Sequence, residues 1–153
     1  MQKRLALVTL FSVAIVVTAL HHTRRVHATP FQDHPGCSVA RLKGTYAWRR
    51  TGVNNVVGGP IAEIGISFYG GDGTRGLIRN TRSSNGVIRP WTDEPAPNGS
   101  YTVDPDCTGS FFDPDGTHSN NVVVLDGGKR FFVLSVAPGT ITTEEGYRIE
   151  AED

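Results

Sequence analysis

Short runs of β-forming residues, separated by turns rich in glycine, aspartate and proline, fill the chain from about residue 44 onward. A two-residue alternation places Tyr46 and Trp48 on one face of a strand expected at 44–51. The glycine-rich turn at 70–73 separates strands expected at 61–69 and 74–80, which is a strong hairpin signal. Further strands are expected at 99–103, 109–113, 121–125, 130–137, 140–143 and 147–151. This pattern predicts an all-β domain.

Hairpin follows hairpin in this pattern, with little sign of a long crossover connection. We therefore expect a single up-and-down antiparallel barrel of about eight strands, with a β-sandwich as the alternative. Residues 81–98 are expected to form a loop with one short strand at 87–89, because Ser, Asn, Gly and Pro interrupt the alternation. Long loops are often functional, so Trp91 in this segment is a candidate ligand contact, although such a residue more commonly caps the edge of a core.

The first 28 residues have the organisation of a secretory signal peptide. Lys3 and Arg4 precede an uncharged apolar stretch at 5–20, and the segment 26–28 ends in a small residue, Ala28. The apolar stretch is shorter than the roughly 20 residues of a membrane span, so cleavage is expected and an uncleaved anchor is the alternative. We predict a signal peptide at 1–28, a flexible lead at 29–40 and a β-barrel domain at 41–153, secreted or periplasmic, with no stable membrane span after cleavage.

Charge argues against nucleic acid as a partner. The whole chain carries 15 basic and 15 acidic residues, and loss of Lys3, Arg4, Arg24 and Arg25 with the signal peptide leaves 11 against 15, a net charge of −4. A nucleic-acid-binding domain needs a basic surface to neutralise phosphates. The sequence gives no indication of the oligomeric state.

Cys37 and Cys107 are the only cysteines, 70 positions apart. In an oxidising compartment, a pair of thiols without a metal-ligand cluster predicts one disulfide. Such a link stabilises the fold by roughly 4 kcal/mol in the chain-entropy model. It is expected to fasten the N-terminal strand to the body of the domain.

The cysteines also belong to a longer pattern. Cys37 is followed by Leu42-x-Gly44-x-Tyr46, by a glycine-rich hairpin and by Gly99-x-Tyr101-x-Val103-x-x-x-Cys107-x-Gly109. This order resembles a group of small exported bacterial proteins of unassigned function, which is itself similar to calycin-like barrels, in particular those of the allene oxide cyclase type. The resemblance implies a barrel with a cavity, closed at its base by an aromatic residue at the position of Tyr46.

Catalytic and metal-binding patterns are sparse. The Gly-x-Ser-x-Gly elbow is absent, and His118 is expected to lie exposed near a turn. No metal or cofactor is predicted: the aspartates of 104–115 suit turn capping better than calcium binding. Glu63 is a weak catalytic candidate if its side chain faces a barrel lumen, where burial would suit it to proton transfer. Alternation, however, favours an interior formed by Ile64, Ile66 and Phe68, which would turn Glu63 to solvent.

Arginines gather in the first half of the domain, and Arg75 and Arg79 are expected to share one strand face. An anion site is possible on this pattern, but outward arginines that protect strand edges are the favoured interpretation. The leading functional hypothesis is a non-enzymatic barrel that binds a small apolar or amphipathic ligand. The alternatives are an enzyme of the cyclase or isomerase type and a surface or periplasmic interaction module. The expected ligand-binding residues are Tyr46, Trp48, Glu63, Trp91 and Tyr101.

Overall fold

A computed structural model describes residues 36–56, 58–95 and 97–150. The chain divides into two units, residues 1–30 and 31–153, and all of the described residues belong to the second unit. The predicted signal peptide at 1–28 lies outside the described residues, as does the part of the lead that precedes Gly36. Neither short helix in the described part of the chain has the length or apolar character of a membrane span.

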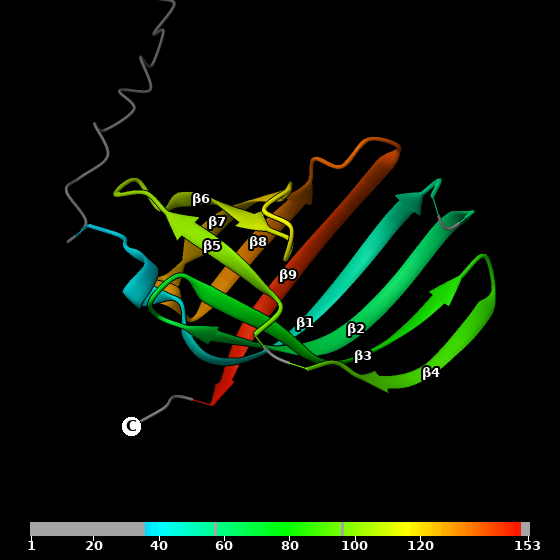
Figure 1. Ribbon diagram of the computed structural model, residues 1–153, viewed down its shortest axis with the longest axis horizontal. Helices are drawn as coiled ribbons and strands as arrows, with labels where there is room; N and C mark the ends of the chain where they lie inside the picture. Colours follow the sequence, from blue (N-terminus) through cyan, green and yellow to red (C-terminus); the bar gives the residue numbers. More distant parts are fainter. Residues whose placement is uncertain (1–35, 57, 96, 151–153) are drawn as a thin grey trace, which may run out of the picture. The chain divides into compact units, whose positions relative to one another are not determined.

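The described residues form nine antiparallel strands and two 3-10 helices (Figure 1). In chain order these are η1 (Val39–Arg41), β1 (Lys43–Asn54), β2 (Gly59–Gly70), β3 (Thr74–Ser84), β4 (Val87–Asp93), β5 (Gly99–Val103), β6 (Thr108–Phe112), β7 (His118–Leu125), η2 (Asp126–Gly128), β8 (Arg130–Ser135) and β9 (Thr140–Glu150).

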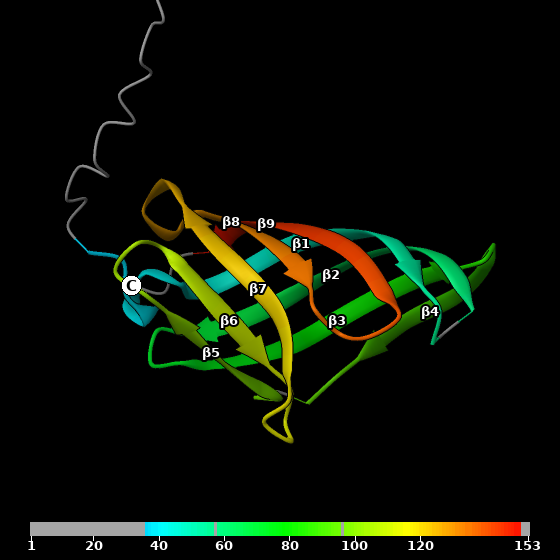
Figure 2. The same ribbon diagram turned by 90° about the horizontal axis from the view of Figure 1, so that it is seen from above.

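Eight of the strands close into the up-and-down barrel that the sequence predicts (Figure 2). Each strand pairs with the next one around the barrel, and β9 returns to pair with β1 along most of its length. β4 is the extra strand and pairs with β3 only. The closure between β3 and β5 is short, because just Thr74–Ser100 and Arg75–Gly99 are paired there. Farther along β3, residues 79–84 pair with β4 instead of β5.

The segment 81–98 is therefore not the loop that its composition indicates. Residues 81–84 continue β3, a tight turn at Asn85 and Gly86 has positive φ at both residues, and residues 87–93 form β4. Asn and Gly tolerate this backbone conformation, which suits a two-residue hairpin turn. Likewise, the strands expected at 140–143 and 147–151 are one continuous strand, β9.

The expectation for the faces of β2 is also wrong. The inward side chains are Glu63, Ser67 and Tyr69, whereas Ile64 is half exposed on the outer face. The physical reason lies on β1, where Trp48 points inward and its indole occupies the space beside Gly65. A Cβ on Gly65 would lie only 2.4 Å from that ring. β2 thus contributes Tyr69 to the interior and turns Ile64 outward.

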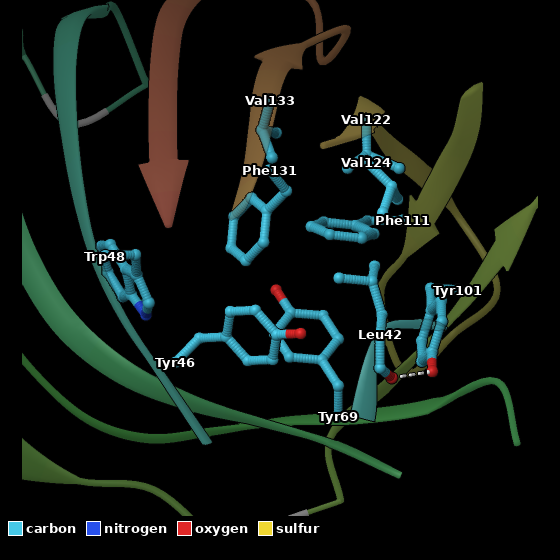
Figure 3. Close-up of a cluster of buried hydrophobic side chains, with 10 residues drawn as sticks. All are labelled: Leu42, Tyr46, Trp48, Tyr69, Tyr101, Phe111, Val122, Val124, Phe131 and Val133. Atoms are coloured by element: carbon cyan, nitrogen blue, oxygen red, sulfur yellow. Dashed lines mark hydrogen bonds between the residues drawn. The ribbon is translucent and has the colours of Figure 1, made fainter. Parts of the chain in front are cut away.

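Aromatic rings fill one end of the barrel, which we call the base (Figure 3). Tyr46, Tyr69, Phe111 and Phe131 are almost completely buried. The Tyr46 and Tyr69 rings meet edge to face with centroids 5.1 Å apart, and Phe131 lies 5.5 Å from both. Such pairs stabilise a fold by about 0.5–1.5 kcal/mol each beyond the area that they bury. The base is therefore solid rather than hollow.

η1 covers the base and is held there by the predicted disulfide between Cys37 and Cys107. The Tyr101 hydroxyl donates to the carbonyl oxygen of Leu42 at 2.5 Å and accepts a hydrogen bond from the Gly71 amide at 3.0 Å. These contacts join the N-terminal segment to two turns of the barrel. Of the flexible lead expected at 29–40, the structure describes residues 36–40, and these include the disulfide-bonded Cys37 and the start of η1.

Arg148 fastens the base from the last strand. Its guanidinium lies 5.5 Å from the centre of the Tyr46 ring and donates to the carbonyl oxygens of Arg41 at 2.7 Å and Gly128 at 2.9 Å. The Tyr46 hydroxyl also donates to the Gly128 carbonyl. One cation therefore satisfies carbonyls from η1 and η2 and stacks on the ring between them.

Candidate functional site

Charged side chains form a row across the concave wall of the barrel, on the side away from the base. We call this set the inner charged row, and it runs through directly paired positions on five adjacent strands: Glu144 on β9, Arg50 on β1, Glu63 on β2, Arg82 on β3 and Arg89 on β4. Opposite charges on neighbouring strands stabilise a sheet, whereas like charges directly opposite destabilise it. The row alternates in sign except at its last pair.

Arg50 is the centre of the row. Its Nη2 and Nε atoms lie 2.6 and 2.9 Å from one carboxylate oxygen of Glu144, and its Nη1 lies 3.5 Å from Glu63. Burial alone would lower the pKa of the Arg50 guanidinium, but the carboxylates of Glu144 and Glu63 more than offset this and raise it. The guanidinium also lies 5.3 Å from the centre of the Trp48 ring. Arg50 is therefore a fixed, permanently charged group.

Glu63 faces the lumen and is 6% exposed. Its carboxylate accepts a hydrogen bond from the side-chain amide of Asn80 and lies 3.8 Å from the Arg89 guanidinium, in addition to its contact with Arg50. Asn80 in turn accepts a hydrogen bond from Arg89 at 2.8 Å. Glu63 thus serves as the anion that holds three donors in place.

A cavity of about 550 Å³ lies next to the row. It occupies the part of the barrel that the aromatic base does not fill, which we call the wide half. Arg50 and Arg75 contribute to its wall, as do the acidic residues Glu94 and Asp113 and the neutral polar residues Asn98 and Ser119. The apolar part of the lining includes Ile61, Leu77 and Ala137. A cavity with this mixed lining suits a small molecule that has both polar and apolar parts.

Arg75 lies on β3, near the end of the strand that is away from Arg82. Its Nη2 atom donates to the carbonyl oxygen of Phe112 at 3.2 Å and lies 3.6 Å from the Asp113 carboxylate. The guanidinium is 4.8 Å from the centre of the Phe111 ring. Arg75 therefore covers the upper surface of the aromatic base and separates it from the cavity.

The five expected ligand-binding residues do not form one site. Tyr46 and Tyr101 belong to the packed base, and Trp48 is buried with its indole nitrogen donating to Ser67 Oγ at 2.8 Å. Glu63 belongs to the inner charged row, where it contacts Arg50. Trp91 is 49% exposed, and Arg79 lies 5.4 Å from the centre of its ring.

Arg75 and Arg79 do not share a face, contrary to the expectation from alternation. Ile66 pairs with Arg79 whereas Ser67 pairs with Leu77, so Ile78 is an additional residue on β3. A bulge of this kind reverses the facing of every residue beyond it. Arg75 therefore points inward, while Arg79 pairs with Asp93 at 3.0 Å in solvent.

Two central residues of the site, Arg50 and Glu144, were not among the expected site residues. Arg50 follows Tyr46 and Trp48 at the same two-residue spacing, which places all three on one face. That spacing is a usable signal, but a charged residue such as Arg50 is ordinarily expected on the outer surface of a barrel. Glu144 carries no such signal, because its neighbour Glu145 is charged as well and faces outward toward Arg49.

Burial also shifts the tyrosines of the base. It raises the pKa of Tyr101 to about 12, and it raises the pKa of Tyr69 well above its ordinary value, with the nearby Glu144 carboxylate adding to the effect. These hydroxyls thus stay protonated at physiological pH. The Tyr101 hydroxyl is a structural donor in this fold.

Of the remaining candidates for chemistry, Asp113 contributes to the cavity wall next to Arg75. His118 is exposed at the start of β7. Asp106 and Asp115 accept hydrogen bonds from the amides of Thr108 and Thr117, respectively, as turn-capping residues do. Within the residues that the structure describes, no three His, Cys, Asp or Glu side chains come together as metal ligands would.

A second hollow, of about 730 Å³, lies on the outer face of β1, β9, β8 and β7. Val123, Phe132 and Leu134 form its apolar floor, and each of them is 42–49% exposed. Arg49 and Glu145 pair with each other at its edge. This surface is the main apolar area on the outside of these four strands.

Comparison with known proteins does not place the chain in a family. No family model matches it, and no curated protein or solved structure shows significant similarity. The closed eight-stranded barrel with one additional strand is compatible with a calycin-like architecture. The chain is thus described by its fold, a small antiparallel barrel with an aromatic base, a charged inner wall and one disulfide.

Proposed function

We propose that this protein is an exported binding protein for a small amphipathic molecule, which it holds in the cavity of the wide half of the barrel. The observation that carries the proposal is the mixed lining of that cavity, which includes the polar residues Arg50 and Asn98 and the apolar residues Ile61 and Ala137. Fixed polar groups orient a ligand, and apolar groups gain free energy by covering its apolar part.

The packed base sets a limit on the ligand. Tyr69, Phe111 and Phe131 occupy the space into which a long apolar molecule would extend. A purely apolar ligand would therefore have to displace well-packed rings or lie among polar groups. Both alternatives are costly, so an amphipathic ligand of modest size is favoured.

Export rests on two independent features. The sequence of residues 1–28 has the organisation of a signal peptide. The disulfide between Cys37 and Cys107 is of the kind that persists outside reducing compartments. Together they support a secreted or periplasmic location.

Filling the cavity tests the proposal. Ala137 lines the cavity and Val136, its neighbour, lies about 39% exposed on the other face of the strand end. We expect Ala137→Trp to abolish binding of the amphipathic dye ANS and of decanoate, measured by fluorescence and calorimetry, while the matched control Val136→Trp retains it. Equal binding by both variants would place the ligand elsewhere and contradict the proposal.

An interaction surface is the second candidate function, favoured by the apolar outer hollow of Val123, Phe132 and Leu134. The same measurements separate the two candidates. If Leu134→Ser abolishes dye binding and Ala137→Trp does not, the outer face is the binding surface.

Glu63 gives less support to the alternative of a cyclase or isomerase. Its carboxylate is engaged by Asn80, Arg50 and Arg89, and Arg50 rather than Glu63 contributes to the cavity wall. Turnover would convert an added compound into a product of the same mass and different chromatographic mobility. The Glu63→Gln variant would not catalyse this conversion.

A further inference from the structure

The inner charged row ends in two cations. Arg82 on β3 and Arg89 on β4 are directly paired across the strands, so their side chains leave the sheet side by side. Glu63, the cross-strand neighbour of Arg82, directs its carboxylate to Arg50 and Arg89. Like charges that face each other in this way destabilise a sheet unless something neutralises them.

Buried donors at the same place lack partners. Within the described part of the chain, no acceptor lies within hydrogen-bonding distance of the Nε atoms of Arg82 and Arg89, and the Ser84 hydroxyl is likewise unpaired. All three atoms are shielded from solvent by the surrounding protein. Buried donors almost always have a partner, because an unpaired one costs about 1–3 kcal/mol in stability.

We propose that this pair of arginines, with Ser84, binds an oxyanion, namely the carboxylate or phosphate head of the amphipathic ligand. The inference rests on the proposed function, since it assigns the polar end of that ligand. The head group extends the alternation of the row by one negative charge beyond Arg82 and Arg89. Arginine is suited to this task because its planar donors match the oxygens of a carboxylate or phosphate.

The pair lies beside the cavity, whose lining does not itself include Arg82, Arg89 or Ser84. Ser84 is paired with Ile61, which lines the cavity, and Arg82 is paired with Glu63, the neighbour of Arg50 in the row. A head group held by Arg82 and Ser84 therefore leaves the rest of the molecule beside Ile61. The row itself holds three cations against two carboxylates, so one added negative charge balances it.

Inorganic phosphate tests the head-group site alone. Thermal unfolding is followed in phosphate and in sodium chloride of matched ionic strength, because a ligand bound to the native state raises the unfolding midpoint. We expect phosphate to raise the midpoint of the wild-type protein and to lose this effect in Arg82→Gln. The matched control Arg79→Gln, on the outer face of the same strand, keeps it.

The chloride arm also separates binding from a structural role. Without an oxyanion, Arg82→Gln is expected to unfold at the same temperature as the wild type or above it, because the substitution removes a like-charge pair. A lower midpoint in chloride together with an unchanged response to phosphate would overturn the proposal, as would a wild-type response to phosphate no larger than that to chloride.

Decanoate and decanol distinguish a ligand head group from a free anion. We expect decanoate to bind the wild-type protein roughly tenfold more tightly than decanol, the effect of one charge-assisted hydrogen-bonded contact, and the difference to vanish in Arg82→Gln. If both compounds bind equally to both proteins, the proposed function stands and the oxyanion site is wrong. If neither binds but phosphate still acts through Arg82, the oxyanion site stands and the amphipathic ligand is wrong.

Discussion

Replacing Arg50 with methionine tests whether the inner charged row holds the barrel together. The substitution keeps an unbranched apolar stem but leaves Glu144, whose side chain is 6% exposed, without its cation. Breaking a buried ion pair costs about 3–5 kcal/mol, and because the Arg50 side chain is 31% exposed we expect a value near the lower end, about 3 kcal/mol. With a denaturant slope of about 1.5 kcal/mol/M, the urea midpoint followed by tryptophan fluorescence should fall by about 2 M.

The chain supplies its own control for this prediction. Arg49 and Glu145 form the equivalent pair on the outer face, where the Arg49 side chain is 69% exposed. Arg49→Met should therefore cost less than about 1 kcal/mol. The double variant Arg50→Met/Glu144→Met should recover most of the lost stability, since no unpaired carboxylate remains. Equal, small losses for Arg49→Met and Arg50→Met would refute the role assigned to the row.

Three further predictions concern the base. Serine at both Cys37 and Cys107 should lower the free energy of unfolding by roughly 4 kcal/mol, measured by urea titration; a loss below about 1 kcal/mol would contradict the bracing role of the disulfide. Burial raises the pKa of Tyr101 to about 12 from about 10 in the unfolded chain. The contribution of the protonated hydroxyl to the free energy of unfolding is therefore complete below about pH 10 and declines by roughly 3 kcal/mol up to about pH 12. Tyr101→Phe should remove this part of the decrease in stability at alkaline pH, and an unchanged decrease would contradict the prediction. Gly146→Ala would place a Cβ 2.2 Å from the Phe131 ring and should cost about 1–3 kcal/mol in the same urea assay; a neutral effect would show that the ring can move.

The barrel could be predicted because its signals are local. Turn residues and two-residue alternation mark most of the strands, and the order of hairpins leaves few ways to connect them. The hairpin of β3 and β4 is hard to predict because Asn85 and Gly86 are followed closely by Pro90 and Pro95, which together indicate one long loop. A proline is compatible with an edge strand, and β4 is an edge strand.

The site was harder to predict because it contradicts the usual sorting of charge and apolar surface. In β2, Ile64 looks like a core residue and Glu63 like a surface residue, yet they lie the other way round. Only the partners explain this: Glu63 is satisfied by Arg50 from β1 and by Asn80 from β3. The bulge at Ile78 is likewise invisible to simple alternation.

Backbone amide shifts in a nuclear magnetic resonance titration with decanoate offer the sharpest check on where this molecule binds. Our account predicts progressive, saturable shifts for residues around the cavity, such as Arg50, Asn98 and Ser119. It would be contradicted by shifts confined to the outer face around Phe132 and Leu134, or by a spectrum that decanoate leaves unchanged.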